Sequence, residues 1–478
     1  MSQYEISALK QELTGLAMVD DPRLVRQKSR DFFWYSPVLK RQLDHVSGDL
    51  VVTPRNEAEV IRVLKACYAQ GVPVTPRGAG TGNYGQAMPL SGGVVLNLAE
   101  MRAVREIGEG RVVTEPGAII AKIDEETRAH SRQEMRMFPS TYRTASIGGF
   151  IGGGSGGVGS ITWGGLRDFG NVLRLRIVTM EAEPRQLELT GEDLHKVMHA
   201  YGTNGIITEV EAPLAPAYDW TEVIVGFDDF MTGARYANDL ARQDGILKKL
   251  ITPIAAPTPH DYLSRDHSFA RRDQSVVLLM IAPHAMDAFL TFHQRATGNA
   301  AAGGKSEILF RSDKTTEEER KNLPPVYELA WNHTTLCARR VERDITYLQV
   351  LYPFPGQLEL IEKIHKHFGD EVPAHLEFVR FDGDITCFGL PLVHFSDEKR
   401  LEEIMTIHED MGAPIFNPHR FTLEEGGMKQ TDAVQLAFKR EADPRGLLNP
   451  GKMIAWDDPE FDYSSQKTYL FPGMQSAE

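Results

Sequence analysis

The chain is organised around the stretch Pro76-Arg77-Gly78-Ala79-Gly80-Thr81-Gly82-Asn83-Tyr84-Gly85, which has four glycines in ten residues. Each glycine in an ordered segment costs about 0.5–1 kcal/mol relative to alanine, because its backbone loses more freedom on folding. Such a run is typical of a loop whose backbone N–H groups approach a ligand closely, above all phosphate oxygens. We interpret it as a diphosphate-binding loop with Arg77 beside it. A tight glycine-rich hairpin without a ligand is the alternative.

The flanking residues predict strands on both sides of this loop. Residues 72–75 and 94–98 are apolar runs. Residues 80–85 match the letters of the dinucleotide fingerprint, but that fingerprint requires a helix to begin within the glycines. Here Pro89 and Gly92-Gly93 follow, and both are poor helix interior. The spacing therefore predicts a phosphate loop between two strands, not a Rossmann turn.

Upstream, the pattern predicts a strand followed by a helix. Residues 50–53 form an apolar run, and Asn56 with Glu59 three positions later resembles a capping box. Apolar residues then recur at helical spacing until Gly71, which fits the position just after a helix.

Length and charge limit the class of protein. At 478 residues, two or three domains are expected. The net charge of −14, without a Lys/Arg cluster, argues against nucleic acid as a partner. No apolar run approaches the roughly 20 residues of a membrane span. The polar amino terminus and three widely spaced cysteines predict a cytoplasmic protein without a disulfide framework.

A second glycine tract covers residues 146–159. It contains Gly153-x-Ser155-x-Gly157, the letters of the hydrolase nucleophile elbow, which needs a buried strand before the serine and a helix after it. Because glycines surround this match, a serine hydrolase using Ser155 is the lesser alternative. We expect instead that the two glycine tracts enclose one long ligand, with its phosphates on the first.

The composition changes near Pro213 and Pro216, which predict a domain boundary near residue 217. Residues 220–411 alternate apolar runs with helical stretches, as an α+β domain does. We therefore divide the chain into residues 1–43, 44–216, 217–411 and 412–478.

These features resemble a known family, the vanillyl-alcohol oxidase superfamily with its PCMH-type FAD-binding domain, and within it the glycolate oxidase subunit and D-lactate dehydrogenase group. The matching blocks are residues 74–82, 113–117, 139–141, 145–149, 167–172, 202–209 and 443–452. The resemblance implies an α+β fold. Residues 44–216 would be a PCMH-type FAD-binding domain of two α/β subdomains, residues 217–411 a substrate-binding cap domain, and residues 412–478 a segment returning to the FAD.

The resemblance also implies which residues hold FAD. They are Pro76, Arg77, Gly78, Ala79, Gly80, Thr81, Gly82, Gly85, Gln86, Pro139, Ser140, Thr141, Ser146, Gly149, Gly153, Ile207, Asn449 and Lys452. Members that bind FAD covalently through this loop carry histidine at the position of Thr81. We therefore expect non-covalent FAD.

The substrate side departs from the D-2-hydroxy acid dehydrogenases. Their GHxGDGNxH block is matched by residues 378–386, which lack its histidines, and their Glu-His-Gly block by Glu424-Glu425-Gly426. A metal-assisted site is therefore not expected.

Flavin chemistry also needs a base that takes the substrate proton and a residue that binds the substrate. The candidates are His419, Tyr347 and Arg380. Further candidates are His333 and the Glu424/Glu425 pair. Two alternatives to these roles are possible: His419 could be a packing residue, and Arg380 could form a structural ion pair.

The resemblance implies an FAD-dependent oxidoreductase, dehydrogenase or oxidase, that oxidises an alcohol, hydroxy acid or phenolic alcohol by hydride transfer to the flavin. The electron acceptor could be oxygen, a quinone or a carrier protein, and a homodimer is one option for its assembly. An FAD-binding relative without turnover is the other alternative.

Overall fold

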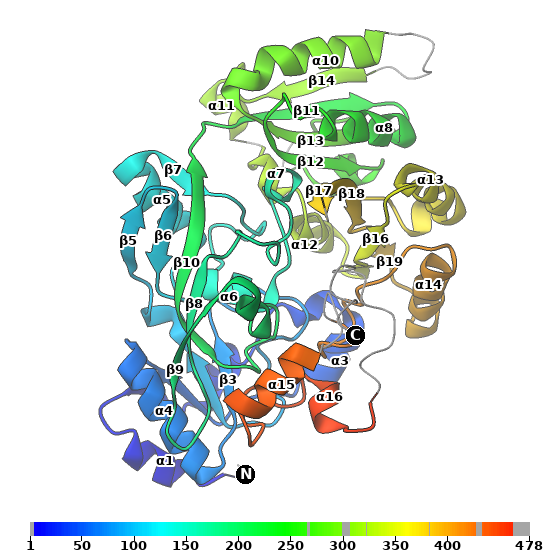
Figure 1. The fold of residues 1–478 in the computed structure, drawn as a ribbon. Helices are drawn as coiled ribbons and strands as arrows, with labels where there is room; N and C mark the ends of the chain where they lie inside the picture. Colours follow the sequence, from blue (N-terminus) through cyan, green and yellow to red (C-terminus); the bar gives the residue numbers. More distant parts are fainter. Residues whose placement is uncertain are drawn as a thin grey trace.

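The computed structural model describes residues 4–264, 268–298, 306–321, 323–381, 383–426 and 433–461. The chain forms two lobes (Figure 1): a first lobe, residues 50–216, and a second lobe, residues 221–410. Helices α1 (Ile6–Glu12), α2 (Pro22–Lys28) and α3 (Pro37–Leu43) precede the first lobe.

The first sheet of the first lobe carries the glycine loop. Parallel strands β2 (Leu50–Thr53), β4 (Val94–Asn97) and β3 (Val74–Arg77) are adjacent, and β1 (Ala17–Val19) adds an antiparallel edge. Helix α4 (Glu57–Gln70) begins where the Asn56 side chain accepts the Glu59 N–H, and it ends at Gly71 with φ 66°. The predicted order of strand, helix, strand, loop and strand is confirmed. No helix follows the loop before β4, as the spacing predicted.

The second sheet of the first lobe is antiparallel, in the order β5 (Val104–Gly108), β6 (Arg111–Thr114), β10 (Ile206–Pro216), β8 (Arg174–Val178) and β9 (Gln186–Thr190). Strand β7 (Gln133–Met135) pairs with β10. Helices α5 (Ile120–Ser131), α6 (Ile147–Gly153) and α7 (Ser160–Trp163) complete this part. Helix α6 lies within the second glycine tract, because Ile147, Phe150 and Ile151 are buried in the core below it.

The second lobe has a four-stranded antiparallel sheet, in the order β12 (Lys248–Ile254), β13 (Ser275–Ile281), β11 (Thr221–Phe227) and β14 (Ser306–Arg311). Smaller sheets comprise β16 (Val350–Tyr352), β18 (Asp384–Gly389) and β17 (Leu376–Phe381), and β15 (Ile345–Tyr347) with β19 (Leu392–His394). The helices are α8 (Phe230–Ala241), α9 (Thr258–Tyr262), α10 (Met286–Gly298), α11 (Glu317–Arg320), α12 (Asn332–Val341), α13 (Gln357–Phe368) and α14 (Glu398–Asp410).

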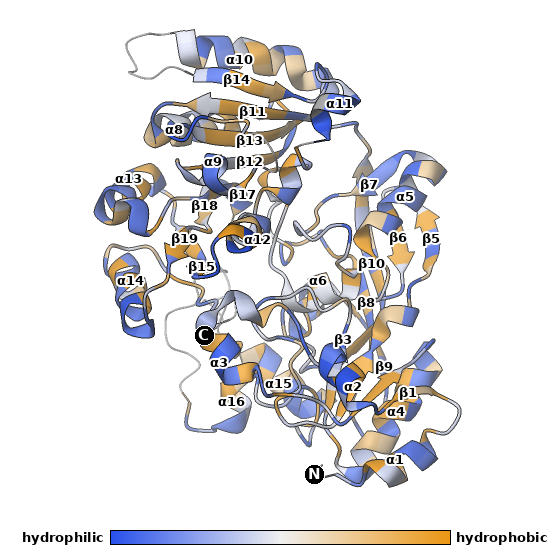
Figure 2. Cartoon of the chain, turned by 180° about the vertical axis from the view of Figure 1, so that it is seen from behind, coloured by the Kyte–Doolittle hydropathy of each residue, from blue (hydrophilic) through white to orange (hydrophobic). Residues whose placement is uncertain are grey.

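Apolar residues are concentrated in the strands, and polar residues are frequent on the helices. Strands such as β13 and β6 are mostly orange, and helices such as α14 carry blue stretches (Figure 2). The mixture of helices and sheets confirms the predicted α+β class. No helix in the described residues is long and apolar enough to cross a membrane.

A buried ion pair joins the lobes. The Lys249 ammonium of β12 lies 2.7 Å from the Glu134 carboxylate of β7, and the Trp220 indole N–H donates to the same carboxylate at 2.8 Å. Both charged side chains are almost fully buried. The pair therefore holds the second lobe against the first.

The last part of the chain returns to the first lobe. Helices α15 (Ala433–Ala442) and α16 (Ile454–Asp457) flank residues 443–453. The Leu447 carbonyl accepts the Val74 N–H, and the Asn449 N–H donates to the Val74 carbonyl. Residues 427–432 and 462–478 of the expected carboxy-terminal segment lie outside the described residues.

Candidate functional site

A cavity of about 260 Å³ is lined by both lobes, and we call it the central cavity. Among the residues expected to hold FAD, those that line it are Pro76, Arg77, Gly78, Ala79, Gly80, Thr81, Gly82, Gln86, Pro139, Ser140, Thr141, Ser146, Gly149, Gly153 and Ile207. The two glycine tracts thus face one space, as the expected enclosure of a long ligand requires.

The first glycine loop, residues 78–85, lies directly against the second glycine tract. The Ser146 hydroxyl accepts the Ala79 N–H at 3.1 Å. A Cβ at Gly78 would lie 2.1 Å from the Ser146 Oγ, so an alanine does not fit here without displacing Ser146. Gly80 has φ +70°, and a Cβ there would lie 2.3 Å from the Arg77 guanidinium. Space therefore favours glycine at position 78, and the left-handed backbone favours it at position 80.

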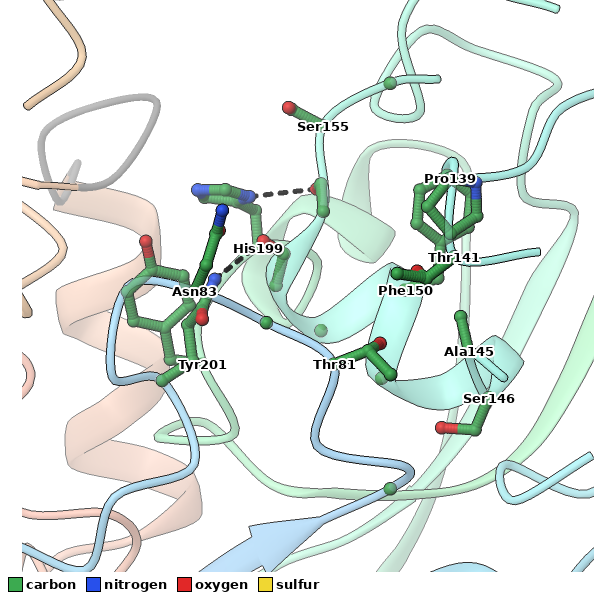
Figure 3. A pocket seen from close by; sticks show the side chains of 18 of the residues that line it. Thr81, Asn83, Pro139, Thr141, Ala145, Ser146, Phe150, Ser155, His199 and Tyr201 are labelled. Carbon is green, nitrogen blue, oxygen red and sulfur yellow. Dashed lines mark hydrogen bonds between the residues drawn. The ribbon is translucent and has the colours of Figure 1, made fainter. Parts of the chain in front are cut away.

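Gln86 makes a second connection between the tracts. Its amide donates to the Gly153 carbonyl at 3.4 Å, and its Oε1 accepts the Tyr84 N–H at 3.0 Å. Figure 3 shows Thr81 of the first glycine loop near Phe150 and Ser146 of the second glycine tract, with Pro139, Thr141 and Ala145 beside them.

Asn449 and Lys452 support the loop from outside the cavity lining. The Asn449 amide donates to the carbonyls of Gln86 (2.8 Å) and Tyr201 (2.7 Å). The Lys452 ammonium donates to the Gly85 carbonyl at 2.7 Å, and burial lowers the pKa of Lys452 to about 7. Gly85 likewise does not line the cavity. These three residues shape the loop from behind.

Asp31 is a cavity residue that the sequence analysis missed. Its carboxylate accepts the N–H groups of Phe33 (2.9 Å) and Ala87 (3.2 Å), and burial raises the pKa of Asp31 to about 6. No motif marks Asp31, because its position depends on the amino-terminal segment packing beside the loop.

His199 and Tyr201 were also missed, although both line the cavity. Both have left-handed backbones with φ 53°. The His199 Nδ1 lies 2.9 Å from the Gly154 carbonyl (Figure 3). Backbone strain of this kind concentrates at functional sites.

The second lobe contributes the opposite wall of the cavity. The residues are Trp331, Asn332, His333, Gln349, Val379, Arg380, Phe381, Phe388, Gly389 and Leu390. Within the described residues, the buried Trp331 Nε1, Asn332 Oδ1 and His333 Nδ1 atoms have no hydrogen-bond partner. Unpaired buried polar atoms are rare and call for an explanation.

His333, a candidate named from the sequence, reaches across to the first lobe. Burial lowers the pKa of His333, and a hydrogen bond to the Ser140 backbone opposes that shift. The imidazole therefore stays neutral more readily than an exposed one.

His419 does not line the cavity, and the geometry does not support it as a base. Its Nδ1 lies 2.8 Å from the Ser36 hydroxyl and its Nε2 lies 3.1 Å from the Tyr347 carbonyl. Both ring nitrogens are thus occupied, and burial lowers the pKa of His419 to about 3. The packing alternative describes His419 better.

The surroundings of Tyr347 and Arg380 differ from those expected of a base and a substrate-binding residue. Tyr347 is fully buried and does not line the cavity. Arg380 lines it, but its guanidinium pairs with Asp244 at 3.0 Å and donates to the Gly383 carbonyl at 3.3 Å. Glu424 accepts the N–H groups of Ile454 and Ala455 at the start of α16. Tyr347 and Glu424 thus lie outside the cavity lining, and the pairing of Arg380 with Asp244 matches the alternative of a structural ion pair.

Ser155 lines the cavity but lacks the context of a nucleophile elbow. It follows helix α6, whereas an elbow needs a strand before the serine. The hydrolase alternative is therefore not favoured.

The residues present fit a dinucleotide. Backbone groups line one side of the cavity at positions where a Cβ would clash, and Arg77 supplies a cation beside them. Among the described residues, no group of three or more His, Cys, Asp or Glu side chains is placed to hold a metal ion.

Comparison with known proteins agrees with this geometry. Residues 48–187 match the FAD binding domain family. The glycolate oxidase subunit GlcD of Bacillus subtilis (strain 168) is 24% identical over 456 residues, which are 86% of this chain and 89% of the relative. The D-lactate dehydrogenase of Archaeoglobus fulgidus is 28% identical over 428 residues, 85% of this chain and 91% of the relative. The solved structure of alkyldihydroxyacetonephosphate synthase shares the fold, with a TM-score of 0.70 at 15% identity over 93% of this chain and 85% of that one.

Proposed function

We propose that this protein is an FAD-dependent oxidoreductase that oxidises the CH–OH group of a 2-hydroxy acid. The proposal starts from residues 48–187, which match the FAD binding domain family. The observation that carries the cofactor is the contact between the two glycine tracts at one cavity, made by the Ala79 N–H and the Ser146 hydroxyl. The substrate class follows from relatives named for glycolate and D-lactate, which are both 2-hydroxy acids.

The first glycine loop would hold the diphosphate of FAD through its backbone N–H groups, with Arg77 nearby. Each such bond to a charged oxygen contributes about 1.5–3 kcal/mol, so several bonds suffice without a covalent link. Pro139, Ser140 and Thr141 would lie along the same molecule, and Ile207 would contact it through the main chain. Asn449 and Lys452 would keep the loop in shape.

FAD, when bound, supplies the acceptor for the hydride of the substrate C–H bond. The chain must then provide a group that takes the hydroxyl proton. We assign that role to His333, whose side chain is part of the second-lobe wall of the cavity. The lowered pKa of His333 keeps the ring able to accept a proton near neutral pH.

The protein would act in the cytoplasm and pass its electrons to a separate acceptor. The chain has three cysteines, widely spaced in the sequence, and this usage fits the reducing cytoplasm. Oxygen, a quinone or a carrier protein would reoxidise the flavin, and a homodimer would be one form of assembly.

The test is purification followed by an anaerobic substrate screen. We expect a yellow protein with stoichiometric FAD, whose flavin absorbance bleaches with glycolate or lactate and less readily with simple alcohols. A colourless protein that does not bind added FAD at micromolar concentration would refute the cofactor. A yellow protein bleached by none of the hydroxy acids would refute the substrate class.

A further inference from the structure

One face of the strand pair β17 and β18 is directed at the central cavity. The strands pair antiparallel, with Phe378 opposite Cys387, and successive side chains of a strand point to opposite faces. Phe378 and Cys387 lie in the core of the second lobe. The positions that alternate with them, Val379, Phe381 and Phe388, are therefore on the other face. All three line the cavity, and we call them the aromatic face.

The two rings of the aromatic face are packed from behind but are not fully buried. The Phe381 and Phe388 rings lie 5.9 Å apart, nearly perpendicular to one another. The Phe388 ring lies 6.0 Å from the ring of Phe416, which is buried in a small cluster with Leu351. Phe381 and Phe388 each keep part of their surface accessible. Apolar surface left accessible in a concave site is typical of a ligand pocket.

The aromatic face lies across the cavity from the second glycine tract and the turn after it. A Cβ at Gly164 would lie 3.7 Å from the Arg380 carbonyl of β17, and a Cβ at Gly156 would lie 3.8 Å from the Trp331 ring. The aromatic face is also outside residues 48–187, which match the FAD binding domain. Since the proposed function places the FAD diphosphate on the first glycine loop, the aromatic face is left for the substrate.

The charges of this wall indicate which part of a substrate it meets. Of the described residues of the second-lobe wall, Arg380 alone carries a permanent charge, and its guanidinium pairs with Asp244 at 3.0 Å. Leu390 adds a further apolar side chain to the same wall. A wall of this composition favours an apolar group, because a charged group would lose its hydration there without gaining a partner.

We propose that the aromatic face binds the side chain of the substrate, so that the enzyme prefers a 2-hydroxy acid with a large apolar substituent, such as a phenyl group, over glycolate and lactate. The inference rests on the proposed function for the hydroxy acid itself. The preference for an apolar side chain can be measured without turnover.

The first experiment compares ligands that differ only by a phenyl group. Calorimetry gives the dissociation constants of phenylpyruvate and pyruvate for the FAD-loaded enzyme, and anaerobic flavin reduction gives kcat/KM for both enantiomers of 3-phenyllactate and lactate. A matching apolar pocket discriminates by about tenfold or more. We expect phenylpyruvate to bind at least about tenfold more tightly than pyruvate, and kcat/KM for 3-phenyllactate to exceed that for lactate by a similar factor.

The second experiment removes the rings one at a time. In Phe381→Ala and Phe388→Ala, we expect the ratio of phenylpyruvate to pyruvate affinity to fall about tenfold, because the phenyl group loses an apolar contact. FAD content and pyruvate affinity should stay close to those of the wild type. Phe395→Ala is the matched control, since Phe395 is also partly exposed in the second lobe but does not line the cavity.

The leucine variants Phe381→Leu and Phe388→Leu keep an apolar side chain and remove only the ring. We expect the affinity ratio to fall about 2–10-fold in them, because an aromatic pair contributes more than its buried area. They decide the question if an alanine variant does not fold. A wild-type ratio in both leucine variants would then overturn the role of the aromatic face.

The remaining outcomes separate this inference from the proposed function. Pyruvate binding as tightly as phenylpyruvate, or no measurable binding of either at millimolar concentration, overturns the apolar preference. So does an equal fall of the ratio in Phe395→Ala. If lactate reduces the flavin but the phenyl group brings no gain, the hydroxy acid function stands and the aromatic face fails. If phenylpyruvate binds with the expected preference but no hydroxy acid reduces the flavin, the aromatic face stands and the function fails.

Discussion

Thr81 predicts that the cofactor is bound without a covalent link. It lines the cavity within the first glycine loop, at the position where covalent members of the superfamily that this chain resembles carry histidine. A threonine hydroxyl does not replace an imidazole in that linkage. We expect acid precipitation to release all FAD into the supernatant, as measured by its absorbance. A protein pellet that keeps flavin fluorescence after washing would contradict non-covalent binding.

If His333 is the base, as we propose, the reaction has a defined pH dependence. A base works when it is unprotonated, and burial lowers the pKa of His333 below its ordinary value of 6.5. The neutral form therefore predominates at pH 6.5. We expect kcat/KM for lactate to stay on its plateau at pH 6.5 and to decrease only at lower pH, where the ring is protonated.

The variant His333→Gln isolates this effect. Removal of a positioned general base lowers kcat by about 10²–10⁴-fold. We expect a loss in this range, with FAD content unchanged and the acid limb of the pH profile abolished. His130→Gln, at an exposed position of α5, serves as the control. The assignment fails if His333→Gln retains the wild-type acid limb.

At the scale of elements, the closeness of the two glycine tracts is the feature that forms the cofactor site. A Cβ at Gly78 would lie 2.1 Å from the Ser146 Oγ, which also accepts the Ala79 N–H. We expect Gly78→Ala to force the tracts apart at a cost of about 1–3 kcal/mol. If this cost falls on the FAD complex, FAD affinity, measured by titration of the apoprotein, should fall about 5–150-fold. Gly245→Ala, where nothing lies within 4 Å of the added Cβ, should bind FAD as the wild type does.

Elements with local signals could be predicted from the sequence. Asn56 and Gly71 mark the ends of α4, and both act as their residue types predict. Helix α6 could not be predicted, because its glycines disfavour a helix by about 1 kcal/mol each relative to alanine. Burial of Ile147, Phe150 and Ile151 overrides that cost, and this burial is a property of the assembled lobe.

The cavity lining could be predicted only in part, because some of its residues are placed by contacts between distant parts of the chain. The first glycine loop stands out in the sequence because its motif is contiguous. Trp331 and Asp31 have no motif, since their place in the wall depends on contacts with Glu377 and Ala87, each more than forty residues away in sequence. His419 was chosen for its proximity to the returning segment, but sequence does not reveal that Ser36 and Tyr347 occupy both ring nitrogens.

The cavity wall comes from two lobes that are already held together in the structure. Lys249 and Glu134 form a buried pair between them, and Lys249 also lies over the Phe138 ring, next to Pro139 of the cavity. A ligand in the cavity therefore meets surfaces whose relative position is fixed in advance. Such preorganisation lowers the entropic cost of binding.

This architecture predicts how FAD stabilises the protein. A ligand that binds only the folded state adds about 2.7 kcal/mol at a free concentration 100 times its dissociation constant. Because both lobes line the cavity, we expect FAD to slow amide hydrogen exchange in residues 78–82 and also in residues 331–333 and 388–390. Strands β11 and β13, which do not line it, are the internal control and should change least. If protection were confined to residues 78–82 and the rest of the first lobe, FAD would contact that lobe alone, and the wall from Trp331 to Leu390 would serve the substrate only.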